Sequence, residues 1–192
     1  PAILTATSAE DGSFSFARVP YGNWIVREIE APTGFVLSEK AYPVTVDADC
    51  AVIEVEIENT CIRGTVQLTK TDRDYPDNKL TGAEFTVYRD SNDNKELDAD
   101  DERLGTLTET GIGVYEMSDL LYGGYFVKET KAPAGFYLDD NAYYFEITTD
   151  GQVVVVENGE AGRGFVNEAY RGNLKITKDS SDGRKDGFAF EV

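Results

Sequence analysis

The stretch YFVKETKAPAGF, Tyr125 to Phe136, begins with the alternation of a β-strand but aims a carboxylate where its apolar residues point. Side chains two residues apart share one face of a strand, so Glu129 lies on the same face as Tyr125 and Val127. Burying a lone carboxylate is costly, and this face must therefore offer Glu129 a partner. The Pro and Gly of APAGF are typical of the turn that ends such a strand.

This stretch belongs to an internal repeat. Tyr21–Leu37 aligns without gaps on Tyr122–Leu138, with 9 identities in 17 positions and an offset of 101. Matches further along the chain keep an offset of 108: Asn59 with Asn167, Arg63 with Arg171, Gly64 with Gly172, and Lys70 with Lys178. We therefore expect three parts: residues 1–61 as the C-terminal part of a first domain, 62–170 as a complete domain, and 171–192 as the N-terminal strands of a third.

Short segments of the complete repeat are rich in Val, Tyr, Phe and Thr and are bounded by Gly, Asp or Asn. They predict strands at residues 64–70, 83–89, 102–109, 113–118, 123–131, 142–148, 152–157 and 164–169. The sequence has no ten-residue amphipathic helical pattern. We therefore predict an all-β sandwich, and tandem copies of it would form a rod.

Each repeat sends one lysine, one glutamate and one asparagine toward its apolar face. Lys70 continues the alternation of Val66 and Leu68, and Asn167 follows Phe165 by two positions. The partial copies repeat this parity with Glu28, Asn59 and Lys178. Full burial lowers the pKa of a lysine to about 5–6 and raises the pKa of a glutamate to about 8–9. The unprotonated amine is then a nucleophile, and the protonated glutamic acid is a general acid.

These groups predict a self-made crosslink in which the Lys70 amine attacks the side-chain amide of Asn167, ammonia leaves, and Glu129 shuttles the protons. Two alternatives remain open: a buried hydrogen-bonded network without a covalent bond, or a Lys70 that reaches solvent from a strand end. Glu28 and Asn59 lack an upstream lysine strand in this sequence, and Lys178 lacks the residues that would follow it. The first repeat thus has the glutamate and the asparagine, and residues 171–192 have the lysine. This predicts that the two parts pair, either between two copies of the chain or by folding back of one chain.

The motifs LTKTD, LTGAEFTVY, GGYFVKETKAPAGF and FVNEA resemble the collagen-adhesin B-type (Cna B-type, SpaA-like, prealbumin-like) domains of Gram-positive surface proteins and pilins. The resemblance covers the whole middle repeat and the matching parts of both flanking ones. It implies an inverse immunoglobulin-like Greek-key sandwich. It also implies that the YFVKETKAPAGF stretch is an E-box, whose glutamate (Glu129, with Glu28 equivalent) promotes a spontaneous isopeptide bond between Lys70 and Asn167.

By this resemblance, the chain is a non-enzymatic stalk or backbone segment of an extracellular adhesin or pilin, anchored to the cell wall through a region outside this sequence. Its partners would be neighbouring repeats and, through other domains, the host matrix or cell surface. Two other classes stay open. The repeats would be binding modules for a matrix protein or glycan, or a regulatory β-domain attached to an enzyme.

An acidic stretch has the spacing of an EF-hand-type or dockerin-type calcium loop. Oxygen-bearing side chains occupy loop positions 1, 3, 5, 9 and 12 through Asp90, Asn92, Asn94, Asp98 and Asp101, and Glu96 offers its carbonyl at position 7. Lys95 replaces the usual glycine at position 6, and position 12 is Asp rather than Glu, which predicts weak affinity. Calcium is thus the one candidate cofactor, and none is required for the crosslink. A solvated hairpin tip is the alternative.

Composition excludes several partners. The net charge of −18 over 192 residues argues against nucleic acid and anionic membranes, which are themselves polyanions. The absence of histidine removes the commonest general base and metal ligand. No apolar run is long enough to span a membrane. Cys50 and Cys61 would lie about 35 Å apart if residues 51–59 form a strand, so we expect no disulfide between them.

Overall fold

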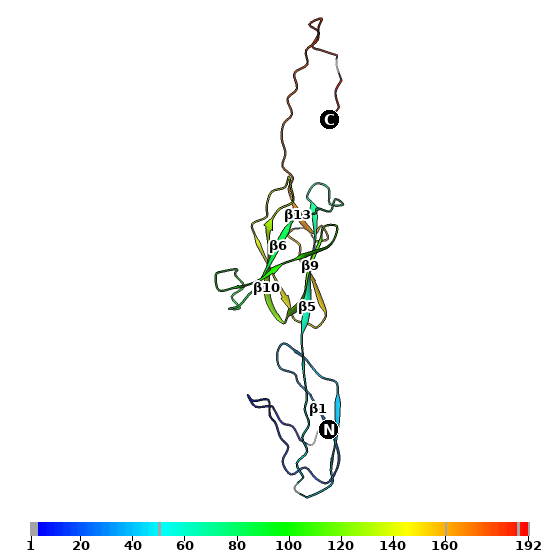
Figure 1. Ribbon diagram of the computed structural model, residues 1–192, viewed down its shortest axis with the longest axis vertical. Helices are drawn as coiled ribbons and strands as arrows, with labels where there is room; N and C mark the ends of the chain where they lie inside the picture. The colour runs from blue at the N-terminus through cyan, green and yellow to red at the C-terminus, as the bar shows by residue number, and fades with distance from the viewer. Residues whose placement is uncertain (1–3, 50, 160, 188, 192) are drawn as a thin grey trace.

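The computed structural model describes residues 4–49, 51–159, 161–187 and 189–191. Within these residues every regular element is a strand, so the all-β prediction is confirmed. The strands are β1 (Gly22–Arg27), β2 (Phe35–Val36), β3 (Ala41–Val46), β4 (Thr60–Cys61), β5 (Arg63–Asp72), β6 (Glu84–Arg89), β7 (Glu102–Thr106), β8 (Thr108–Gly111), β9 (Val114–Leu121), β10 (Gly123–Lys131), β11 (Ala142–Ile147), β12 (Gln152–Val155) and β13 (Phe165–Asn167). The molecule is elongated, with the two ends of the chain on opposite sides of a central sandwich (Figure 1).

The central sandwich, which we call the middle domain, consists of two sheets. One has the strand order β11-β10-β6-β7, and the other has the order β12-β5-β9-β8, with β13 also paired to β5. Apolar side chains from both sheets fill the space between them; they include Val66, Leu68, Phe85, Val87, Tyr115, Tyr125, Val127, Phe145, Ile147 and Phe165. The predicted two-sheet packing is therefore confirmed.

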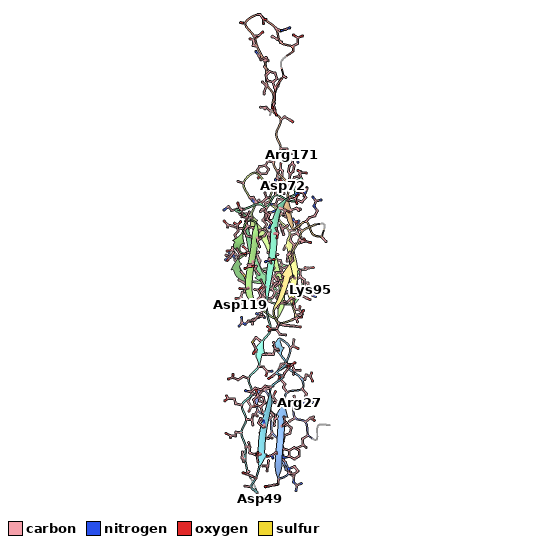
Figure 2. All side chains as sticks on the ribbon, turned by 90° about the vertical axis from the view of Figure 1, so that its right-hand side faces the viewer. Arg27, Asp49, Asp72, Lys95, Asp119 and Arg171 are labelled. Carbon is pink, nitrogen blue, oxygen red and sulfur yellow. The ribbon has the colours of Figure 1, made fainter. Side chains whose placement is uncertain are left out.

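Strand β5 holds the sheet together along its whole length. One edge pairs antiparallel with β9, while the other edge pairs in parallel first with β12 and then with β13. The first and last strands of the middle domain thus lie side by side, with Lys70 opposite Phe165. Figure 2 shows Asp72, at the end of β5, close to Arg171, where the chain leaves the sandwich.

The predicted single strand at residues 102–109 is wrong, because it divides at Leu107. β7 belongs to the sheet of β6, and β8 belongs to the sheet of β9. Leu107 crosses between the sheets with a buried side chain, and its N–H donates to the Phe85 carbonyl at 2.9 Å. Leu104 and Leu107 lie three positions apart and would face opposite sides of a single strand, but the crossing takes one residue and leaves no turn motif in the sequence to mark it.

Residues 4–61, which we call the first repeat, have only part of a sandwich. β1 pairs antiparallel with β3, and β2 pairs antiparallel with β4. Residues 51–59, whose alternation favours a strand, form none. Cys50 lies outside the described residues, so the expected absence of a Cys50–Cys61 disulfide stays a prediction.

Residues 171–192, the C-terminal segment, form no strand in their described part. Leu174 and Ile176 are 70% and 59% exposed, because a single strand without a neighbouring sheet has no partner for its backbone or its apolar side chains. The division into three domains stays a prediction. Among the residues described, none forms a helix that would cross a membrane.

Candidate functional site

Three strands bring Lys70, Glu129 and Asn167 together inside the middle domain. Lys70 comes from β5, Asn167 from β13 beside it, and Glu129 from β10 in the facing sheet. Their exposed fractions are 0%, 0% and 2%, so the prediction that all three face the core is confirmed. Their chemical role stays a prediction.

The Glu129 carboxylate is the centre of the cluster. The Asn167 Nδ2 group donates to both of its oxygens at 2.9 Å, and the backbone N–H of Asp139 donates to Oε2 at 2.9 Å. The Lys70 Nζ lies 3.9 Å from Glu129 Oε1 and donates a shorter hydrogen bond, 2.8 Å, to the Phe165 carbonyl. The Lys70 amine therefore has its shortest contact with a neutral backbone carbonyl, which lies two residues before Asn167 on β13.

The carbonyl oxygen of the Asn167 amide is buried and has no hydrogen-bond partner among the described atoms. An unpaired buried acceptor is costly and is uncommon in folded proteins. A half-turn of the amide would exchange Oδ1 and Nδ2, and a protonated Glu129 would then donate to Oδ1. That arrangement polarises the carbonyl toward attack, which is the state that amide chemistry requires.

Burial moves the two ionisable groups toward their neutral forms. Desolvation lowers the pKa of Lys70 to about 8, although the nearby charges of Glu129, Asp139 and Asp72 oppose this change. Desolvation also raises the pKa of Glu129, against the hydrogen bonds from Asp139 and Asn167 and the charge of Lys70. Transfer of a proton from the ammonium to the carboxylate therefore costs far less here than in water.

A second layer of polar contacts, which the sequence analysis missed, holds the site in place. Asn158 accepts the Val166 N–H at 2.7 Å and donates to the Val166 carbonyl at 2.9 Å, so its amide binds β13 as a neighbouring strand would. The same Nδ2 donates to Asp139 at 2.7 Å, and Tyr143 donates to that carboxylate at 2.7 Å. Neither Asn158 nor Asp139 lies in a repeated motif, so no pattern in the sequence singled them out.

The first repeat contains the same glutamate–asparagine pair. Asn59 Nδ2 donates to Glu28 Oε1 at 2.6 Å, and the Ser38 N–H donates to Glu28 Oε2 at 2.8 Å. Ser38 lies 101 positions before Asp139, so both the side-chain and the backbone contact recur. Lys178 is in the C-terminal segment, where its amine donates to the Asp179 carbonyl, and the structure does not bring it to Glu28 or Asn59.

In the acidic loop, residues 90–101, backbone N–H groups of the loop donate hydrogen bonds to its own carboxylates. Asp90 accepts the N–H groups of Asn94 and Lys95, and Asp101 accepts those of Ser91 and Asp98. Lys95 has a φ of 61°, the left-handed conformation that glycine usually provides at this position of a calcium loop.

Side-chain oxygens of Asp98 and Asn94 are also engaged within the loop. Asp98 accepts the side-chain N–H groups of Asn92 and Asn94, and the Asn94 side chain accepts the Glu96 N–H. Among the described residues, no group of three or more Asp, Glu, His or Cys side chains is arranged to hold a metal ion. Calcium binding therefore stays a prediction.

The chain matches the family described as the SpaA prealbumin-like fold domain over residues 2–61 and 64–160. It therefore belongs to this family, and its fold is the tandem prealbumin-like sandwich predicted from its motifs. No curated protein matches the chain.

Several solved structures are similar to the chain. The Bacillus anthracis TIE protein is 25% identical, with a TM-score of 0.70 over 85% of this chain and 28% of that one. A streptococcal ancillary pilin is 24% identical over 79% of this chain and 43% of that one, with a TM-score of 0.41. BcpA, the major pilin subunit of Bacillus cereus, is 26% identical over 55% of this chain and 28% of that one, with a TM-score of 0.41. The chain thus spans less than half the length of each of these three.

Proposed function

We propose that this chain is a structural segment of the stalk or backbone of a Gram-positive surface protein or pilin, and that its middle domain crosslinks itself through Lys70 and Asn167. One observation carries the proposal: an amine with a lowered pKa, a carboxyl with a raised pKa and a side-chain amide are buried together. Membership in the SpaA family supports the structural role. The chain would act outside the cell and would need no cofactor.

The reaction is a single intramolecular aminolysis. Glu129 takes a proton from the Lys70 ammonium, and the neutral Nζ attacks Cγ of Asn167. The tetrahedral intermediate places a negative charge on Oδ1, which the Glu129 proton stabilises. The Cγ–Nδ2 bond then breaks, Glu129 passes the second amine proton to Nδ2, and ammonia leaves. Each molecule reacts once, so the chain is not an enzyme.

The position of the bond would explain its use in a stalk. Figure 2 places Asp72 and Arg171 at one end of the middle domain and Asp119 at the other. A pulling force enters along β5, and a Lys70–Asn167 amide would pass it directly to the exit at residue 168. The 96 residues between positions 70 and 167, residues 71–166, would carry no load. An amide also resists the reductants that cleave disulfides.

Intact-mass measurement of the purified chain tests this proposal. We expect the wild-type mass to be lower than the sequence mass by one ammonia from the middle domain. Glu129→Ala should restore that ammonia, whereas Glu116→Ala, an outward-facing glutamate of β9, should not. A wild-type protein with the full sequence mass would overturn the crosslink and leave a buried network only.

Binding of a matrix protein or glycan, and attachment to an enzyme, remain the alternative functions. A positive screen against such ligands, with no ammonia lost from the chain, would favour the first of them.

A further inference from the structure

The last strand of the middle domain, β13, has a neighbouring strand on one edge only. Among the described strands it pairs with β5 alone. On its other edge the Asn158 side chain takes the place of a strand, because its Oδ1 accepts the Val166 N–H at 2.7 Å and its Nδ2 donates to the Val166 carbonyl at 2.9 Å. One side-chain amide thus closes the free edge of β13, with the same donor and acceptor that a backbone peptide would offer.

Val166, the residue that Asn158 holds, lies between the two residues of β13 that face Lys70. The Phe165 carbonyl accepts the hydrogen bond from Lys70 Nζ at 2.8 Å, and Asn167 carries the amide that this amine would attack. A shift of Val166 along or away from β5 would therefore move both groups at once. Asn158 thus holds the segment on which the geometry of the Lys70 and Asn167 pair depends.

This hold requires an amide at position 158. Nδ2 of Asn158 also donates to Asp139 Oδ2 at 2.7 Å, the oxygen to which Tyr143 donates at 2.7 Å. Burial raises the pKa of Asp139, but its hydrogen bonds, first those from Asn158 and Tyr143, outweigh burial and keep that pKa below its ordinary value, so Asp139 is ionised. An ionised aspartate at position 158 would have no donor for Val166 or Asp139, and two carboxylates would face each other.

The sequence contains a chemical route to that aspartate. Asn158 is followed by Gly159, and this is the only Asn-Gly pair in the chain. In such a pair the backbone nitrogen of the glycine can attack the asparagine Cγ, because glycine has no side chain to hinder the approach. Gly159 is exposed, and nothing within 4 Å among the described atoms would meet a Cβ atom on it. The hydrogen bonds of the Asn158 amide oppose the reaction, because two of them break when Nδ2 leaves.

We propose that Asn158 and Gly159 form a modification site that controls the crosslink of the middle domain. In the open chain Asn158 is converted to aspartate or isoaspartate, and the product no longer holds β13 in position for Lys70. Control of the crosslink rests on the proposed function, whereas the reaction of Asn158 itself does not.

The conversion needs only the chain and water. The backbone nitrogen of Gly159 attacks Cγ of Asn158 and loses its proton, the Cγ–Nδ2 bond breaks, and Nδ2 takes up a proton and leaves as ammonia. Water then opens the resulting succinimide ring at one of its two carbonyl groups. The net change is one water molecule gained for one ammonia lost, and no group is oxidised or reduced.

Folding decides which of the two asparagines reacts. In the folded domain the hydrogen bonds to Val166 and Asp139 protect Asn158, while Asn167 is buried beside Lys70. In the open chain Lys70 and Asn167 are far apart, whereas Asn158 stays next to the nitrogen that attacks it. The Lys70–Asn167 bond would in turn keep β13 on β5 and prolong the protection of Asn158. Each reaction therefore opposes the other.

Peptide mapping by mass spectrometry tests the reaction of Asn158, because it assigns each lost ammonia to one asparagine. The full chain is held at mildly alkaline pH, either folded or in urea. We expect Asn158 to exchange ammonia for water in urea and to remain intact in the folded protein. Gly159→Ala should largely abolish the exchange and keep the fold, since a Cβ atom there meets no neighbour. Equal rates in folded and unfolded chain, or in Gly159→Ala and wild type, would overturn the proposal.

Refolding kinetics test the effect on the crosslink. Chain kept unfolded since its synthesis is refolded, and the Lys70–Asn167 bond is followed by mass. Asn158→Asp should slow its formation by about tenfold, the factor expected from one buried hydrogen-bonding group left unpaired. Asn141→Asp is the matched control and should keep the wild-type rate: Asn141 also donates to Asp139 at 2.7 Å, but it is exposed and forms no hydrogen bond to β13 among the described residues.

A double variant separates the loss of one donor from a general loss of fold. Asn158→Asp combined with Asp139→Asn returns a donor to the pair and should recover part of the crosslinking rate. A double variant no faster than Asn158→Asp would contradict the proposal, as would an Asn158→Asp chain that crosslinks as fast as the wild type; both results leave the proposed function intact. A wild type that forms no Lys70–Asn167 bond would refute the proposed function and the control of it by Asn158, and peptide mapping would still decide whether folding protects Asn158.

Discussion

The substitution Glu129→Gln isolates the contribution of the crosslink to stability. Glutamine has nearly the shape of glutamate, so the change opens no cavity in a site where the side chain is fully buried. It removes the carboxyl group that moves protons between Lys70 and Asn167, and their side chains then remain unlinked. The variant should therefore keep the fold and lose the tether between β5 and β13.

The expected loss follows from the loop that the bond closes. Positions 70 and 167 are 97 residues apart, and by analogy with disulfides a tether of this length is worth about 4.7 kcal/mol. A domain of roughly 105 residues unfolds with an entropy of about 0.22 kcal/mol/K, so the midpoint should fall by roughly 20 °C. Surface substitutions away from such features change stability by about 0.5 kcal/mol or less. The two effects differ enough to be distinguished in one experiment.

Scanning calorimetry and intact-mass measurement on the same samples provide the assay. Glu116→Gln, on the outer face of β9, is the matched control and should leave both the midpoint and the mass deficit unchanged. The reasoning fails if Glu129→Gln has the full sequence mass and still unfolds within a few degrees of a wild type that has lost ammonia. It fails equally if the variant loses ammonia as the wild type does, because Glu129 would then have no part in the reaction.

Three further predictions concern acid–base chemistry, packing and metals. When chain that has been kept unfolded in urea since its synthesis, and is therefore not yet crosslinked, is refolded at a series of pH values, the crosslinking rate followed by mass should be bell-shaped. Above about pH 8, the lowered pKa of Lys70, the Lys70–Glu129 pair loses its one shared proton, and below the raised pKa of Glu129 it binds a second. A rate that keeps rising above this range would contradict the shared-proton mechanism. Gly164→Ala should destabilise the domain by about 2–3 kcal/mol in urea unfolding, because φ is 76° and a Cβ would lie 2.4 Å from a backbone oxygen, whereas Gly159→Ala, with nothing within 4 Å, should be near neutral. EDTA should leave the melting midpoint unchanged, since the carboxylates of residues 90–101 accept the loop's own N–H groups; a clear drop would reveal a structural cation.

Much of the strand pattern was predictable from local sequence. The expected strand at residues 123–131 coincides with β10, and the expected strand at residues 64–70 lies within β5. The division of residues 102–109 was not predicted, because the chain changes sheets at the single residue Leu107 and no turn motif marks the crossing. In the described residues after Arg171 the expected strand does not form, since strand propensity needs a neighbouring sheet to act on.

The polar contacts that surround the site could also not be predicted from the local sequence. Asn158 and Asp139 lie in different loops, and nothing in their spacing marks them as neighbours of β13. Their contact depends on how the loop after β10 folds back over the end of the sandwich. A search for repeated residues finds Glu28 and Asn59, but it passes over Ser38, because that contact uses a backbone N–H that any residue except proline provides.

The amino-acid sequence by itself determined which side chains face the core, including Lys70, Glu129 and Asn167, because the two-residue period of a strand is a local property of the backbone. It also determined, through the repeat, that Glu28, Asn59 and Lys178 are their counterparts. Only the tertiary structure decided that the first three meet, because the contacts depend on the parallel register of β13 on β5 and on the packing of β10 from the opposite sheet.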